Sequence, residues 1–149
     1  MMNLHVYLAG QIHDNWREDI REQAQSMNLP IEFSGPMENH ERSDNIGEEI
    51  LGEQSDPVFK DEAASSLNNL RTEVLMQKAD VVIALFGEKY KQWNSAMDAG
   101  AAIAMGKPFI LIRPRELHHP TKELANKAQV VVETKQQALQ ALSYIFEKN

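Results

Sequence analysis

The sequence contains no cysteine among its 149 residues, and this absence removes several kinds of chemistry at once. A disulfide framework, a thiolate nucleophile and a cysteine-ligated metal site all require a cysteine sulfur. The chemistry of the chain must therefore be sought in other side chains.

A run or stripe of basic residues is also absent. The 15 Lys and Arg residues are outnumbered by 22 Asp and Glu residues, which gives a formal net charge of −7. Proteins bind polymeric nucleic acid mainly by neutralising its phosphates, so a nucleic-acid polymer is not an expected partner. A single nucleoside or nucleotide remains compatible with this charge, because one phosphate needs only a few backbone donors at the start of a helix.

Long apolar runs are missing as well. No run approaches the roughly 20 residues that a membrane-spanning helix requires, and the first ten residues show no basic segment before an apolar one. We therefore expect a cytoplasmic protein with no membrane partner. The length, together with 42% hydrophobic residues, predicts a single domain over residues 1–149.

Five short apolar runs alternate with segments of helical periodicity. The third run is apolar throughout, as is typical of a central parallel strand that is covered on both faces. Alternation of this kind predicts an α/β fold, a doubly wound domain with helices on both faces of a five-stranded parallel sheet in the flavodoxin-like order 2-1-3-4-5. The five predicted strands cover residues 4–10, 29–36, 80–87, 108–114 and 129–134.

One segment breaks this pattern. Residues 36–61 are acidic, follow no regular period and contain Gly47, Gly52 and Pro57, so we predict a long acidic loop with at most one helical turn at 46–51. Connections this long in a compact domain often serve as lids or binding loops. The helix predicted after this loop places an apolar stripe on one face, consisting of Ala63, Leu67, Leu70 and Val74.

In doubly wound sheets, ligands bind outside the carboxyl ends of the strands. This rule directs attention to residues 10–14, 86–93 and 113–120. Arg17, in the first turn of the first predicted helix, is interpreted as a surface charge.

The stretch WNSAMDAGAAIAMGKP, residues 93–108, contains one carboxylate, Asp98. Ser95 and Asp98 have the spacing of a capping box, which predicts a structural role for the acid at a helix start. The alternative is chemical, because the surrounding side chains are too small to shield an acid. Gly100 costs about 1 kcal/mol relative to alanine within a helix, a cost that is tolerated where the sheet, a subunit or a ligand must approach closely.

Two further clusters flank this helix in the predicted fold. Tyr7 and Gly10 lead into a helix start whose amides could receive a ligand, although a packed tyrosine and an ordinary turn explain them equally well. Tyr90 and Trp93 could stack on a flat base, with amides nearby, or could simply anchor a surface loop.

Histidine gives little support for a metal centre. His40, Asp44 and Glu48 share helical spacing, but acidic segments of this kind are usually solvated. We expect no metal and no cofactor.

The segments YLAG, ADVVIALF and DAGAAIAMGKP together resemble the nucleoside 2-deoxyribosyltransferase superfamily, and with EIL and KYKQWN the whole chain is similar to its small bacterial YtoQ family. In that superfamily a glutamate attacks the anomeric carbon of the sugar. The resemblance implies that Asp98 is the catalytic acid, with Tyr7 beside it, and that the protein forms homo-oligomers. The substrate-binding residues expected with it are Gly10, Gln11, Ile12, Gly87, Gln92, Trp93, Asn94 and Ser95.

Three departures from the superfamily pattern are visible. Asp98 is one methylene shorter than glutamate, Asn94 and Ser95 stand in place of Gly-Thr, and Thr72 stands where many members have an aspartate. We therefore weigh three hypotheses: an N-glycosidase or deoxyribosyltransferase acting on a nucleoside or nucleotide, a non-catalytic nucleotide-binding or sensor module, and an oligomeric interaction module.

Overall fold

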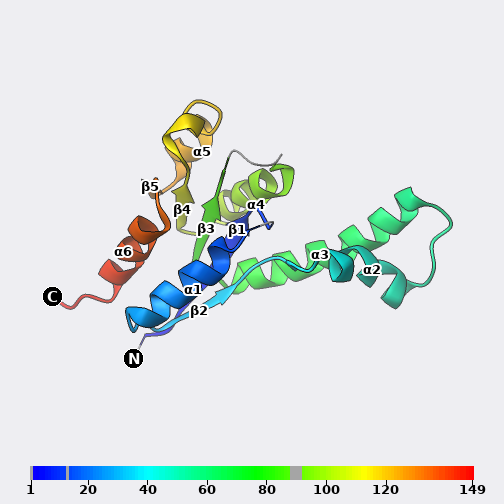
Figure 1. Cartoon of the computed structure of the whole chain (residues 1–149), viewed down its shortest axis with the longest axis horizontal. Helices are drawn as coiled ribbons and strands as arrows, with labels where there is room; N and C mark the ends of the chain where they lie inside the picture. The colour runs from blue at the N-terminus through cyan, green and yellow to red at the C-terminus, as the bar shows by residue number, and fades with distance from the viewer. Residues whose placement is uncertain (1, 13, 88–91) are drawn as a thin grey trace.

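The computed structural model describes residues 2–12, 14–87 and 92–149. Its centre is a parallel sheet in the order β2-β1-β3-β4-β5, which confirms the predicted fold (Figure 1). The strands lie within the ranges predicted from the sequence, and they are β1 (Leu4–Gly10), β2 (Ile31–Ser34), β3 (Val81–Leu85), β4 (Phe109–Ile112) and β5 (Val130–Val132).

Helices cover both faces of the sheet. On one face, α1 (Trp16–Ser26) and α6 (Lys135–Ile145) pack against alternate strand residues through Trp16, Ile20 and Leu139. On the other face, α4 (Trp93–Ala104) and the end of α3 (Pro57–Lys78) pack through Ala99, Ala102 and Met76. The sheet thus separates two apolar clusters, as a doubly wound fold requires.

The link between β4 and β5 is partly helical. It contains a short 3-10 helix, η1 (Arg115–Leu117), and α5 (Lys122–Lys127), which lies beside α4. No helix in the described part of the chain combines the length and the apolar character needed to cross a membrane.

The predicted acidic loop at residues 36–61 is wrong. The segment contains α2 (His40–Leu51) and the first turn of α3, which form a helical hairpin. Asn39 caps α2 by accepting a hydrogen bond from the Arg42 amide, and Asp56 caps α3. Gly47 lies where α2 crosses Ala63 and Ala64, and a Cβ at Gly47 would overlap the backbone of both residues. This glycine permits close helix packing and does not interrupt the helix.

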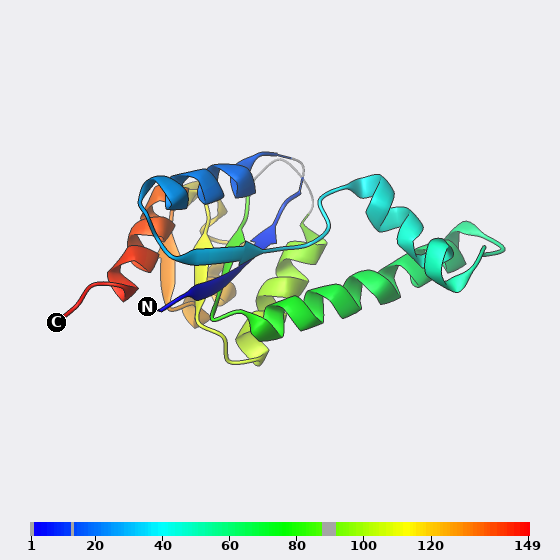
Figure 2. The same cartoon turned by 90° about the horizontal axis from the view of Figure 1, so that it is seen from below.

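The hairpin projects away from the sheet, as two perpendicular views show (Figure 1 and Figure 2). The apolar stripe predicted to be the buried face of α3 is therefore only partly buried. Ala63 packs against α2, but Leu70 is 60% exposed and Val74 is also exposed. The prediction failed because periodicity identifies an apolar face without showing whether another element covers it.

Candidate functional site

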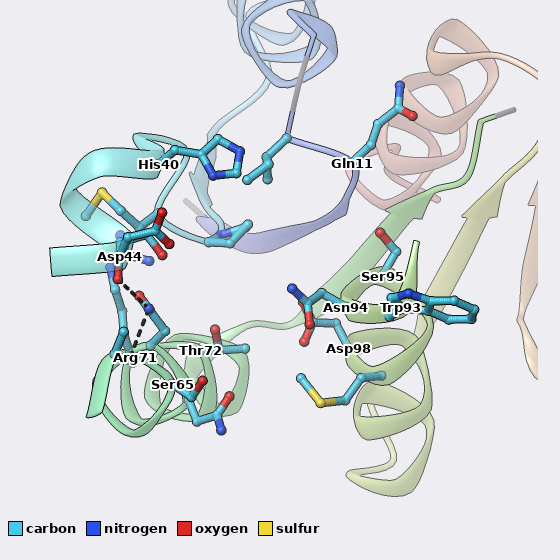
Figure 3. Close-up of a pocket in the computed structure, with 18 of the residues that line it drawn as sticks. Gln11, His40, Asp44, Ser65, Arg71, Thr72, Trp93, Asn94, Ser95 and Asp98 are labelled. Carbon is cyan, nitrogen blue, oxygen red and sulfur yellow. Dashed lines mark hydrogen bonds between the residues drawn. The ribbon is translucent and has the colours of Figure 1, made fainter. Parts of the chain in front are cut away.

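A cavity of about 510 Å³ lies beyond the carboxyl ends of β1 and β3, where the strand order reverses. Its floor is formed by the β1–α1 turn and the first turns of α4, and the α2–α3 hairpin supplies the opposite wall (Figure 3). Residues 113–120, the third region indicated by the sequence, do not line this cavity.

Asp98 lies in the second turn of α4 and not at its cap. The helix begins at Trp93 with Gln92 as the N-cap residue, so Ser95 is already helical and buried. The predicted capping box between Ser95 and Asp98 is therefore absent, because the helix begins three residues earlier than that motif requires. The Asp98 side chain instead points toward α3 across the cavity (Figure 3).

The Asp98 carboxyl group is buried, with 8% of the residue exposed. Among the described residues, no donor forms a hydrogen bond to it. Burial raises its pKa from 3.8 to about 6, and the positive charge of Arg17 partly opposes this rise. A carboxylate without hydrogen bonds in a cavity retains its full capacity to interact with a ligand.

Tyr7 lies on β1 and is fully buried. Burial raises the pKa of its hydroxyl to about 12, and the negative charge of Asp98 contributes to the same rise. The Thr72 side chain lowers that pKa, yet the hydroxyl forms no hydrogen bond of ordinary geometry with any described residue. Thr72 faces Asp98 from α3 (Figure 3), so the position that is aspartate in many superfamily members does lie at the cavity.

The β1–α1 turn depends on Gly10. Its φ angle is +127°, and a Cβ there would lie 2.5 Å from the Leu85 carbonyl oxygen, so only glycine fits without strain. Gln11 and Ile12 follow and line the cavity. The Gln11 amide nitrogen donates to Asp14, while its oxygen is buried with no partner among the described residues.

Gln92, the residue before α4, bonds back to Gly87, which follows β3. Its amide donates to the Gly87 carbonyl, and its oxygen accepts from the Gly87 amide at 3.4 Å. Gly87 itself does not line the cavity, but it lies beside the Gln11 side chain. The Gln92 amide predicted to contact substrate is thus already bonded to the backbone.

Trp93, predicted as a stacking residue, borders the cavity. It is 75% exposed, and its ring points away from the other labelled cavity residues (Figure 3). As the first helical residue, it directs its side chain outward from the start of α4. Asn94 lies next to Asp98 on the cavity side. Tyr90, the other predicted stacking residue, falls outside the described residues.

The hairpin wall was not recognised from the sequence as a set of site residues. Asn68 joins its two helices by donating hydrogen bonds of 3.0 Å to the Ser43 and Ala64 carbonyls. A helical stripe of polar residues on α3 was the available signal, and it consists of Asp61, Ser65, Asn68, Asn69 and Thr72. Across residues 2–12, 14–87 and 92–149, no group of three His, Asp or Glu side chains is placed to hold a metal.

Comparison with known proteins decides the family. The model of the nucleoside 2-deoxyribosyltransferase YtoQ family matches residues 7–146. The chain belongs to the YtoQ family. It is 68% identical over 146 residues to the YtoQ protein of Bacillus subtilis (strain 168), covering 98% of this chain and 99% of that protein.

Two solved structures share the fold of this YtoQ-family chain at low sequence identity. A conserved protein from Enterococcus faecalis V583 has a TM-score of 0.66 and 16% identity, covering 97% of this chain and all of the other. The CMP N-glycosidase BcmB of Clostridium botulinum has a TM-score of 0.51 and 17% identity, covering 94% and 98%.

Proposed function

We propose that the chain binds a nucleoside or nucleotide in the cavity and cleaves its N-glycosidic bond, with Asp98 as the central acid. The observation that carries this proposal is the Asp98 carboxyl group, which is buried in the cavity and receives no hydrogen bond from the described residues. Such a group is costly to bury, and a polar ligand is the partner that would offset the cost.

The reaction needs an anionic Asp98. As the C1′–N bond breaks, its electron pair leaves with the base, which takes a proton, and positive charge develops on C1′ and the ring oxygen. A nearby carboxylate stabilises that charge. Water then forms the C1′–O bond and loses a proton, which gives hydrolysis. In the transfer reaction, the nitrogen of a second base bonds to C1′ and loses its proton.

Two considerations favour hydrolysis over covalent transfer. Asp98 is shorter than glutamate by one C–C bond, about 1.5 Å, and an attacking atom must come within roughly 3 to 3.5 Å of its carbon. The space left by the shorter side chain suits a water molecule. The family description and the CMP N-glycosidase fold neighbour support chemistry at an N-glycosidic bond in general.

The test is release of free base from a panel of nucleosides and nucleoside monophosphates, followed by chromatography, with and without a second base as acceptor. We expect release by the wild-type protein to rise with pH through about 6, because the raised pKa of Asp98 delays its ionisation. Asp98→Asn should reduce the rate at least about 100-fold, since the amide carries no charge.

Asp44→Asn is the matched control, because Asp44 is an exposed carboxylate on the far wall of the same cavity. Base release by Asp44→Asn should show the same dependence on pH as base release by the wild-type protein. Equal base release by wild-type protein and Asp98→Asn would refute the proposed role of Asp98. Absence of release from every compound would refute cleavage.

We also propose that the chain forms a homo-oligomer through the hairpin. An apolar groove of about 530 Å³ runs beside α2 and α3 and includes Ile46, Leu67, Leu70 and Val74. The tip of the same hairpin exposes four further apolar side chains, Ile50, Leu51, Val58 and Phe59. Exposed apolar surfaces of this kind commonly mark protein interfaces. If two hairpins paired about a twofold axis, a single interface would bury the apolar surface of both copies.

Sedimentation velocity at micromolar concentration tests this arrangement. The wild-type protein should sediment as a dimer or larger species, and Leu70→Glu combined with Val74→Glu should shift it to monomer. Tyr144→Glu alters an exposed residue on α6, far from the hairpin, and should leave the assembly intact. A monomeric wild-type protein would exclude the proposal.

A further inference from the structure

Arg17 is the one charged residue among the largest fully buried side chains of the described structure. It lies in the first turn of α1, where the sequence indicated an exposed surface charge. Its relative exposure is 0%, so the structure contradicts that interpretation. An arginine is rarely fully buried without specific partners, so its contacts identify its role.

The guanidinium group binds the end of β1 and the turn that follows it. Nε donates to the Leu8 carbonyl at 3.1 Å, Nη1 to the Gln11 carbonyl at 2.7 Å and Nη2 to the Gly10 carbonyl at 3.0 Å. Trp16 also donates to the Gln11 carbonyl, at 2.7 Å. One side chain therefore binds three carbonyl groups, and two of them, those of Gly10 and Gln11, belong to residues that line the cavity.

The surroundings of Arg17 are built to hold it in place. The guanidinium lies 4.7 Å from the centroid of the Trp16 ring, and Nη1 lies 3.8 Å from the Glu38 carboxylate. Gly35 leaves room for the Arg17 side chain, because a Cβ at Gly35 would lie 3.3 Å from Nε of Arg17. Lysine could not reproduce this planar, several-point contact.

The charge of Arg17 also acts on two site residues, Asp98 and Tyr7. It lowers the pKa of both Asp98 and Tyr7, against the effect of burial. Arg71 from α3 also lowers the pKa of Tyr7, and Glu38, Asp14 and Arg21 act on the charge of Arg17. The titratable residues that line the cavity with Asp98 from the hairpin are His40, Asp44 and Asp61. Arg17 is the charged residue that most directly favours the anionic form of Asp98.

We propose that Arg17 is a positioning residue for the site: from outside the cavity lining, its guanidinium holds the β1–α1 turn in the shape that receives the ligand. The ligand part of this inference rests on the proposed function. A second expected consequence, an effect of the Arg17 charge on the titration of Asp98, does not, because it concerns Asp98 with or without turnover.

The decisive experiment follows the carboxyl carbon of Asp98 by carbon-13 NMR as a function of pH, with the resonance assigned by its loss in Asp98→Asn. We expect Arg17→Met to raise the Asp98 midpoint by at least about one pH unit, as removal of a nearby opposite charge predicts. The rate of base release at pH 6, relative to its plateau, should then fall about fivefold.

Arg17→Lys separates charge from geometry. The midpoint of Asp98 should stay close to that of the wild-type protein, while KM rises about fivefold, as the loss of one hydrogen bond to the turn predicts. Arg21→Met is the matched control, because Arg21 is an exposed arginine on the same helix that also approaches Glu38. It should leave both readouts unchanged.

An unchanged Asp98 midpoint in folded Arg17→Met, or an equal shift in Arg21→Met, would overturn the inference. If Arg17→Met does not fold, Glu38→Gln decides the question. Removal of that carboxylate should lower the Asp98 midpoint, and no change would count against the role of Arg17. A wild-type protein that releases no base would refute the proposed function and leave the titration interpretable.

Discussion

Asp98→Asn should be more stable than the wild-type protein by about 3 kcal/mol at pH 8 and nearly equal to it at pH 4. The pKa of Asp98 is raised from 3.8 to about 6 in the folded protein, and each pH unit corresponds to about 1.4 kcal/mol. The unfolded chain therefore ionises first as the pH rises. The free energy of unfolding of the wild-type protein therefore falls by about 3 kcal/mol between about pH 4 and pH 6 and stays at the lower value above pH 6. The neutral amide of Asp98→Asn does not ionise, so this variant keeps its stability over the same range.

Urea unfolding of both proteins at several pH values measures the difference. Asp44→Asn serves as the control, since substitution of an exposed carboxylate should change stability by less than about 0.5 kcal/mol. A constant difference between Asp98→Asn and wild-type protein from pH 4 to pH 8 would show that the carboxyl group is not destabilised by burial. Combined with loss of turnover, the expected result would identify a group retained for function at the expense of stability.

Gly47→Ala should destabilise the protein by about 3 kcal/mol, although alanine is the better helix former. The added Cβ would lie 2.7 Å from the Ala63 Cβ and would overlap the Ala63 and Ala64 backbone, so α2 and α3 must separate. Backbone atoms cannot rotate away as a flexible side chain can. The loss should appear in urea unfolding and in faster amide hydrogen exchange along α2.

Gly100→Ala is the matched comparison, because it makes the same substitution within another helix. A Cβ at Gly100 meets no atom within 4 Å, so this variant should gain up to about 1 kcal/mol from helix propensity alone. Similar effects of the two alanines would show that Gly47 does not mediate a close helix contact.

The sheet could be predicted from the sequence because each strand is a short apolar run between breakers. Val81 to Leu85, apolar on both sides, indicates a central strand, and Thr134 and Gln137, which form the capping box of α6, have the sequence spacing of that motif. These signals are local. They need no knowledge of which elements meet in space.

The hairpin could not be predicted in the same way. α2 has few apolar residues, and its Gly47 is typical of a break unless the two alanines of α3 that it contacts are known. The site residues differ in the same way in how far the sequence reveals them. Asp98 stands out as a single acid among small residues, whereas Arg17 has the sequence context of an exposed helix residue. Its burial follows from the path of the β1–α1 turn, where three carbonyl groups converge on it.

The projection of the hairpin separates two properties of the cavity. Asp98 and the turn held by Arg17 belong to the sheet and the helices packed on it, while His40, Asp44 and Ser65 belong to an arm outside that core. Substitutions on the arm can therefore alter the shape and polarity of the cavity without loosening the core that holds the acid. Within this architecture, the residues of the arm can change independently of Asp98, the acid proposed to act on the N-glycosidic bond.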